Sequence, residues 1–95
     1  MTRYALSPAA RRDIIHIWLY TADRWGLDQA DDYIAQIEED LHKVALGLRV
    51  AQPIDELWKI RSGHHLCIFA TEGEDLVWVI RILHERMDVP RRLSD

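Results

Sequence analysis

Five side chains in the second half of the 95-residue chain could carry out chemistry on RNA. Lys59 and Arg61 lie two positions apart in a predicted strand, so both side chains point to one face of it. Arg81 lies in a later predicted strand, and His84 and Arg86 follow it. Cleavage of RNA without a metal ion needs a general base, a general acid and cations that stabilise the developing charge. These residues could supply all three if the fold brings the strands together.

Neighbouring acids count against this nuclease hypothesis. Glu85 and Asp88 flank His84 and Arg86, with which they can pair, and their charge repels phosphate. Arg81 lies in an apolar strand and is expected to pair with Asp88 or Glu85, because a buried cation needs a partner. The whole chain carries a net charge of −4 and has no basic excess. We therefore expect no catalytic residue and no direct, specific nucleic-acid binding.

The cysteine and histidine positions predict neither a metal nor a cofactor. The chain has one cysteine, Cys67, which lies between apolar residues and is expected in the core. His64 and His65 are adjacent, so in a strand they would point to opposite faces and could not chelate one ion. Four glycines form no phosphate-binding loop.

Two amphipathic segments predict helices over residues 8–25 and 29–48, because their apolar residues recur with helical spacing. Ser7 and Asp28 can cap the two N-termini, and Gly26 can end the first helix. Since only a few residues separate the segments, the helices should form an antiparallel hairpin. The acids of the second helix are either a solvated face or a contact for a basic segment of a partner protein or a second copy of the chain.

Three segments joined by short turns predict an antiparallel meander of strands at 57–62, 65–71 and 76–83. The last is almost wholly apolar, which is typical of a central strand, and residues 4–6 should add at a sheet edge. The fold class is therefore α+β, with an N-terminal helical hairpin packed on a small antiparallel sheet. We expect one domain over residues 1–95.

The third strand should present one face to the helices and one away from them. Strict alternation predicts that Trp78, Ile80 and Ile82 face the helices and that Val77, Val79, Arg81 and Leu83 face away. The outer face then needs a cover, from a helical turn in residues 87–95 or from a partner.

Of the four tryptophans, Trp18, Trp25 and Trp78 lie on core stripes, and Trp58 is expected to be exposed as an interface anchor.

Several segments, in this order, resemble the ParE toxins of bacterial toxin–antitoxin pairs. They are Leu6–Ile14, Ile17–Thr21, Arg24–Gly26, Tyr33–Ile34, Lys59–His65 and Val79–Asp88. The resemblance covers nearly the whole chain and implies the RelE/ParE fold. It also implies a toxin that binds and poisons DNA gyrase and that a ParD-like or related antitoxin neutralises, with no catalysis.

This resemblance and the exposed positions above nominate two sets of contact residues. The target-binding candidates are Arg61, Arg81, His84, Arg86 and Asp88. The antitoxin-binding candidates are Trp18, Trp58, Val77 and Val79.

Two alternatives remain open at the level of sequence. RelE members share the fold but cut mRNA on the ribosome with Lys and Arg, often together with a Tyr or His near the C-terminus. The segment after the last predicted strand contains no tyrosine. The second alternative is an inactive toxin that only binds its antitoxin.

The location and assembly of the chain follow from bulk properties. No run of apolar residues is long enough for a membrane span or a signal peptide, and a single cysteine fits a reducing compartment. We expect a cytoplasmic protein that contacts no membrane. We expect it to assemble as a homo-oligomer or as a hetero-oligomer with its antitoxin.

Overall fold

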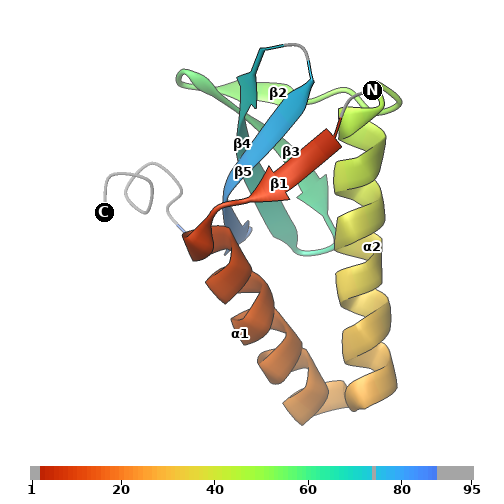
Figure 1. Cartoon of the computed structure of the whole chain (residues 1–95). Coiled ribbons are helices and arrows are strands. Elements are labelled where there is room, and N and C mark those ends of the chain that lie inside the picture. The colour runs from red at the N-terminus through yellow and green to blue at the C-terminus, as the bar shows by residue number, and fades with distance from the viewer. Residues whose placement is uncertain (1–2, 74, 88–95) are drawn as a thin grey trace.

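The structure, a computed structural model, describes residues 3–73 and 75–87. In chain order the elements are β1 (Arg3–Leu6), α1 (Pro8–Trp25), α2 (Leu27–Ala45), β2 (Gln52–Ile54), β3 (Leu57–Ser62), β4 (His65–Glu72) and β5 (Leu76–His84). Figure 1 shows the hairpin of α1 and α2 beside a twisted sheet. Within this described part, neither helix is both long enough and apolar enough to cross a membrane. The helical turn predicted in residues 87–95 lies outside it, apart from Met87.

The five strands form one sheet in the order β1-β5-β4-β3-β2. The pairs β2–β3, β3–β4 and β4–β5 are antiparallel, which confirms the predicted meander. β1 pairs in parallel with β5 and forms the predicted edge strand. β5 therefore lies between two strands, as its apolar sequence indicated. The short edge strand β2 was not predicted, because three residues carry too little alternation to stand out.

Helix α1 begins as the sequence predicts. The Ser7 hydroxyl accepts a hydrogen bond from the Ala10 backbone N–H at 3.0 Å and donates one to the Ile80 carbonyl at 2.7 Å. Pro8 occupies the first helical position, where its missing N–H has no helical acceptor. One serine thus caps the helix and also fixes its start to β5.

Helix α2 runs over Leu27–Ala45, so both predicted ends shift toward the N-terminus. Gly26 has a φ of 94°, and this single residue turns the chain from one helix directly into the next. Asp28 therefore lies in the first turn of the helix and makes no capping bond. The helix stops before Gly47, whose φ of 75° does not continue a right-handed helix.

The main core lies between the helical hairpin and one face of the sheet. Its most buried side chains include Ile17, Ile37, Leu41, Ile60, Cys67, Phe69, Val79 and Ile82. A second, smaller cluster contains Ile68 and Leu83. Cys67 is fully buried, as predicted, and burial raises its pKa to about 12.

A β-bulge interrupts the pairing of β4 with β5. Ile68 pairs with Arg81, whereas the next residue, Phe69, pairs with Val79, so Ile80 is an extra residue on β5. The bulge resets the in–out alternation of β5 near its middle. A pattern of strict alternation therefore cannot describe both halves of this strand.

The predicted orientation of β5 is consequently wrong in its first half. Val77 and Val79 face the helices and are 5% and 0% exposed, instead of pointing away from them. Beyond the bulge, Ile82 faces the helices and Leu83 belongs to the second cluster, as expected.

The exposure of the tryptophan side chains differs in part from the prediction. Trp25 is 64% exposed and is not a core residue. Trp18 is half-buried, and its indole N–H donates to Asp31 of α2 at 2.8 Å. Trp58 is 39% exposed, in agreement with its predicted exposure.

Candidate functional site

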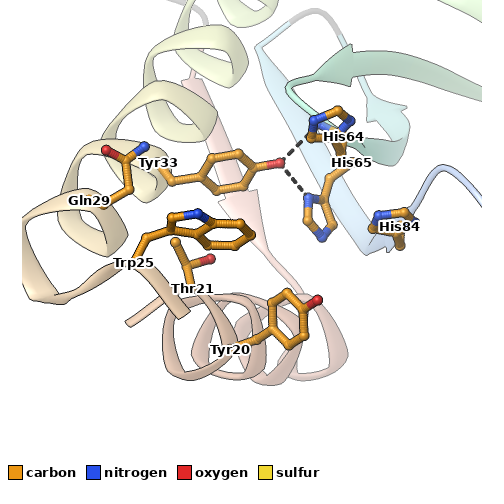
Figure 2. Close-up of a pocket in the computed structure, with 8 residues that line it drawn as sticks. All are labelled: Tyr20, Thr21, Trp25, Gln29, Tyr33, His64, His65 and His84. Atoms are coloured by element: carbon orange, nitrogen blue, oxygen red, sulfur yellow. Dashed lines mark hydrogen bonds between the residues drawn. The ribbon is translucent and has the colours of Figure 1, made fainter. Parts of the chain in front are cut away.

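A pocket of about 340 Å³ opens between the helical hairpin and the end of the sheet. Its walls are Tyr20, Thr21 and Trp25 of α1, Gln29 and Tyr33 of α2, His64 and His65 at the β3–β4 turn, and His84 at the end of β5. Figure 2 shows these side chains gathered from four parts of the chain around one space. We call it the histidine pocket. No Lys, Arg, Asp or Glu lines it among the described residues.

Tyr33 connects α2 to the β3–β4 turn at the wall of the histidine pocket. Its hydroxyl accepts a hydrogen bond from the His64 backbone N–H at 2.9 Å and lies 2.6 Å from His65 Nδ1 (Figure 2). The phenol oxygen can donate its proton and can also accept a second hydrogen bond, so the tautomer of His65 decides which of the two groups donates. In either case the phenol joins α2 to the β3–β4 turn through both histidines.

The turn can receive this phenol because of Gly63. A Cβ at this position would lie 2.6 Å from the Tyr33 hydroxyl oxygen, and the φ of Gly63 is +58°. Position 63 therefore requires glycine for two reasons, the positive backbone angle and the close approach of the Tyr33 ring. The turn and Tyr33 form one interlocked unit.

The electrostatics of the pocket favour uncharged groups. Burial, followed by the neighbouring His84 and His64, lowers the pKa of His65 to about 4, so this ring is neutral at pH 7. Burial also raises the pKa of Tyr33, which keeps its phenol protonated. The His84 ring lies edge-on to the ring of His65, with centroids 5.3 Å apart. Tyr33 and His65 thus present neutral hydrogen-bonding groups.

A charged rim lies next to this neutral interior. Glu85 accepts from His64 Nδ1 at 3.0 Å and forms an ion pair with Arg61. The His84 Nδ1 accepts from the Arg86 backbone N–H at 3.1 Å, so this side chain caps the end of β5. The rim exists because β4 and β5 pair His65 with His84, which brings the β3–β4 turn beside the end of β5.

Arg81 was expected to pair with Asp88 or Glu85, but Glu85 pairs with Arg61 and His64 instead. Its guanidinium forms a bidentate ion pair with Asp13 of α1, at 2.8 and 3.1 Å. Asp13 also accepts from the Ile82 backbone N–H at 2.9 Å. The carboxylate therefore fixes α1 to β5 just after the bulge. Asp88, the other expected partner, lies outside the described residues.

The structure brings some of the target-binding candidates together. Arg61, His84 and Arg86 lie in or beside the rim of the histidine pocket, whereas Arg81 has a partner on α1. Asp88 cannot be placed.

Two antitoxin-binding candidates share a second concave region. Trp58 and Val77 line it with Val44, Leu46, Phe69 and Leu76, and we call it the Trp58 pocket. Val79 is fully buried beneath the helices, so the orientation that nominated it is wrong. Trp18 lies on the hairpin, away from the linings of both pockets.

The sequence reasoning missed most of the histidine pocket. Tyr33 falls among the helically spaced apolar residues of α2, as Trp25 does in α1, and helical spacing alone cannot distinguish a core position from a pocket wall. The signal that could have found the site is the His64–His65 pair directly after Gly63.

The walls of the histidine pocket offer apolar contact and neutral hydrogen-bonding groups. Among the described residues, no cluster of three or more His, Cys, Asp or Glu is arranged to hold a metal ion. Two of the cations considered for RNA cleavage, Arg61 and Arg81, contact carboxylates of the same chain.

Comparisons with known proteins agree on one family. The family model described as the ParE toxin of the type II toxin–antitoxin system parDE matches residues 4–89. Toxin ParE1 of Mycobacterium tuberculosis H37Rv is 38% identical, over 97% of this chain and 98% of its own length. Toxin ParE of Escherichia coli is 34% identical, over 100% of this chain and 96% of its own length.

A solved structure shows the same fold. A chain of the chromosomal ParDE toxin–antitoxin system from P. aeruginosa superposes with a TM-score of 0.75, covering 88% of this chain and 96% of that one at 14% identity. The α+β fold of the RelE/ParE type is thereby confirmed. With a family model over most of its length and relatives above 30% identity, the chain belongs to the ParE toxins of type II toxin–antitoxin systems.

Proposed function

We propose that this ParE toxin binds and poisons DNA gyrase without catalysing a reaction, and that a cognate ParD-like antitoxin holds it inactive. The family match over residues 4–89 carries the toxin–antitoxin part of the proposal. The solved relative, a ParDE system, supports an antitoxin partner. Gyrase as the target is the usual ParE action, and a binding mode of action agrees with the neutral character of the histidine pocket.

The ion pairs of the sheet support a mode of action without RNA cleavage. An RNA-cleaving site needs cations free to stabilise charge on the phosphate. Arg81 is bound bidentately by Asp13, and Arg61 contacts Glu85 at the rim. A phosphate entering here would have to displace these carboxylates and would meet their negative charge.

A supercoiling assay with purified gyrase tests the target. We expect the toxin to inhibit supercoiling and to accumulate cleaved DNA, and preincubation with its antitoxin to restore activity. Arg86→Ala, at the exposed rim, should weaken the inhibition, whereas Lys43→Ala should leave it unchanged. Lys43 is a matched control because it is an exposed cation whose i,i+4 partner is Glu39, in the last turns of α2.

A parallel assay tests the enzymatic alternative. Under the proposed function, mRNA on translating ribosomes stays intact in the presence of the toxin. Cleavage of that mRNA, abolished by the combination of Arg81→Ala and His84→Ala in a variant that still folds, would show that the protein is an mRNA interferase. An inactive toxin would bind its antitoxin but would neither inhibit gyrase nor arrest growth when expressed alone.

A further inference from the structure

A third concave region, of about 370 Å³, lies at the edge of β3 that β2 covers only in part. β2 pairs with β3 over Leu57–Lys59, and in the described sheet residues 60–62 have no strand beside them on that side. Arg49, Lys59 and Arg61 are three of the seven residues that line this region, which we call the Lys59 pocket. No Asp or Glu lines it among the described residues. The pocket therefore has a strongly basic wall.

Arg49 is held in that wall by a buried carboxylate. Asp40 is 9% exposed, pairs with the Arg49 guanidinium at 3.2 Å and accepts from the Ser62 hydroxyl at 2.6 Å. A second nitrogen of the guanidinium donates to the backbone carbonyl of Arg61. Because contacts on two sides fix this cation, it is ordered before a ligand arrives, and binding costs less entropy.

Lys59 is the one cation of the pocket without a partner in the described part of the chain. The residue is half-buried, and no hydrogen bond or ion pair of its side chain is found there. Arg49 and Arg61 are paired with one acid each, Asp40 and Glu85. One of the three positive charges is therefore uncompensated, in a concavity where water screens it less than on an open surface. The pocket favours a ligand with a single negative charge.

The remaining walls favour a carboxylate that is carried by a protein segment. Gln52 is the Cα partner of Lys59, so the two side chains leave the same face of the sheet, and the Gln52 amide can donate to a carboxylate oxygen. Val50 lines the pocket and is 90% exposed. A free inorganic anion would leave Val50 in water, whereas an acidic side chain with an apolar neighbour covers both the cations and Val50.

A nucleic-acid strand fits this charge pattern poorly. It carries one negative charge on every nucleotide, so phosphates beyond the first would need further cations. They would instead lie on a chain of net charge −4, with Glu85 beside Arg61. A single carboxylate between neutral residues avoids that repulsion.

We propose that the Lys59 pocket binds an Asp or Glu side chain of a partner protein, within a segment that has an apolar residue next to the acid. The carboxylate pairs with Lys59 and Arg49, and the apolar neighbour packs on Val50. This inference does not depend on gyrase being the target, because it concerns the chemistry of the segment that the pocket accepts.

Titration of the isotopically labelled, full-length toxin with two blocked peptides tests the site by NMR. The probe is acetyl-Leu-Glu-Leu-amide, and acetyl-Leu-Gln-Leu-amide is the matched neutral peptide. We expect the Glu peptide to shift the amide signals of Val50, Lys59 and Arg61 to saturation. The Gln peptide should bind about tenfold more weakly or less tightly still, which is the size of one charge-assisted contact.

One pair of variants assigns the effect to this pocket. Lys59→Gln removes the charge and keeps most of the side chain, and it should raise the Kd for the Glu peptide about tenfold. Lys43→Gln is the control, because Lys43 is the only other lysine of the chain and lies outside the pocket lining. It should change that Kd by less than about twofold. Thermal melting shows whether both variants are folded.

Three results would overturn the proposal. The first is equal affinity for the Glu and Gln peptides, or no saturable shift with either. The second is an unchanged Kd for the Glu peptide in a folded Lys59→Gln variant. The third is a single-stranded oligouridine RNA that shifts the same signals at lower concentration than the Glu peptide, because the pocket would then accept phosphate. None of these readouts uses gyrase, so a failure of the proposed target is recorded separately.

Discussion

The histidine pocket and the Trp58 pocket lie at different ends of α2 and are built in different ways. The histidine pocket contains Tyr33 of α2 and is lined mainly by aromatic and imidazole rings, with Tyr33 hydrogen-bonded to His65 and to the His64 backbone. The Trp58 pocket begins at Val44 of the same helix and is lined mainly by apolar side chains from β3, β4 and β5. Eleven residues of helix place these positions roughly 16 Å apart, so two partners could contact them separately.

The difference shows how a small domain can present two separate concave surfaces. The walls of the Trp58 pocket are the exposed margin of the main core, since Phe69 and Val77 belong to both. The histidine pocket instead depends on specific polar contacts that join α1, α2, the β3–β4 turn and β5. We therefore expect its geometry to respond to single substitutions that leave the core intact.

The largest expected effect comes from the ion pair that fixes α1 beside the histidine pocket. In Asp13→Ala, the half-buried Arg81 guanidinium loses its bidentate partner and the Ile82 N–H loses its acceptor. We expect the free energy of unfolding to fall by about 2–3 kcal/mol, measured by urea denaturation. Asp23→Ala, which removes an exposed acid of the same helix, is the control and should change stability by less than about 0.5 kcal/mol. Equal effects would show that the ion pair contributes no special stability.

Two glycine substitutions separate backbone strain from pocket geometry. Gly63→Ala and Gly73→Ala both place a side chain at positive φ, +58° and +63°, and share that cost of roughly 1–2 kcal/mol. Only at position 63 does the new Cβ meet Tyr33, and overpacking there should add about 1–2 kcal/mol. Denaturant midpoints measure the difference. A Gly63→Ala variant as stable as Gly73→Ala would mean that Tyr33 moves aside without cost.

The phenol of Tyr33 gives a smaller effect. Tyr33→Phe keeps the ring but leaves the His64 N–H and His65 Nδ1 without their partner, and we expect a loss of about 1–2 kcal/mol. Tyr4→Phe is the control, because the Tyr4 ring packs against the core and no hydrogen bond of its hydroxyl is found in the described part of the chain. It should be nearly neutral. Thermal melting of both variants decides whether the network stabilises the pocket.

The smallest effect is a dependence of stability on pH. The pKa of His65 is about 4 in the folded protein and 6.5 as its ordinary value, so the unfolded chain binds a proton that the folded chain does not. His65 therefore favours folding fully above pH 6.5, and this contribution is lost as pH falls from 6.5 toward 4. Because the ring is partly exposed, we expect a loss of only about 1 kcal/mol. The His65→Asn variant should show a weaker dependence of the melting temperature on pH between about 4 and 6.5. An unchanged slope would contradict the lowered pKa of His65.

The elements of the fold were predictable wherever one short segment carried its own signal. The Ser7 cap, the stripe of α2 and the strand Leu57–Ser62 are confirmed, since caps and periodicity act over a few neighbouring residues. β2 was missed because it is too short for a pattern. Val77 and Val79 were placed on the wrong face because the bulge at Ile80 depends on pairing with β4.

The sequence by itself therefore determined the helical hairpin, the meander, the buried Cys67 and the family resemblance. Only the tertiary structure decided which residues meet. Asp13 was not expected to bind Arg81, a residue 68 positions away, and Tyr33 was not expected to bind His65, 32 positions away. Such contacts depend on how helices and strands approach in space, and no local pattern encodes that distance. The histidine pocket is made of these long-range contacts, which is why it became visible only in the folded chain.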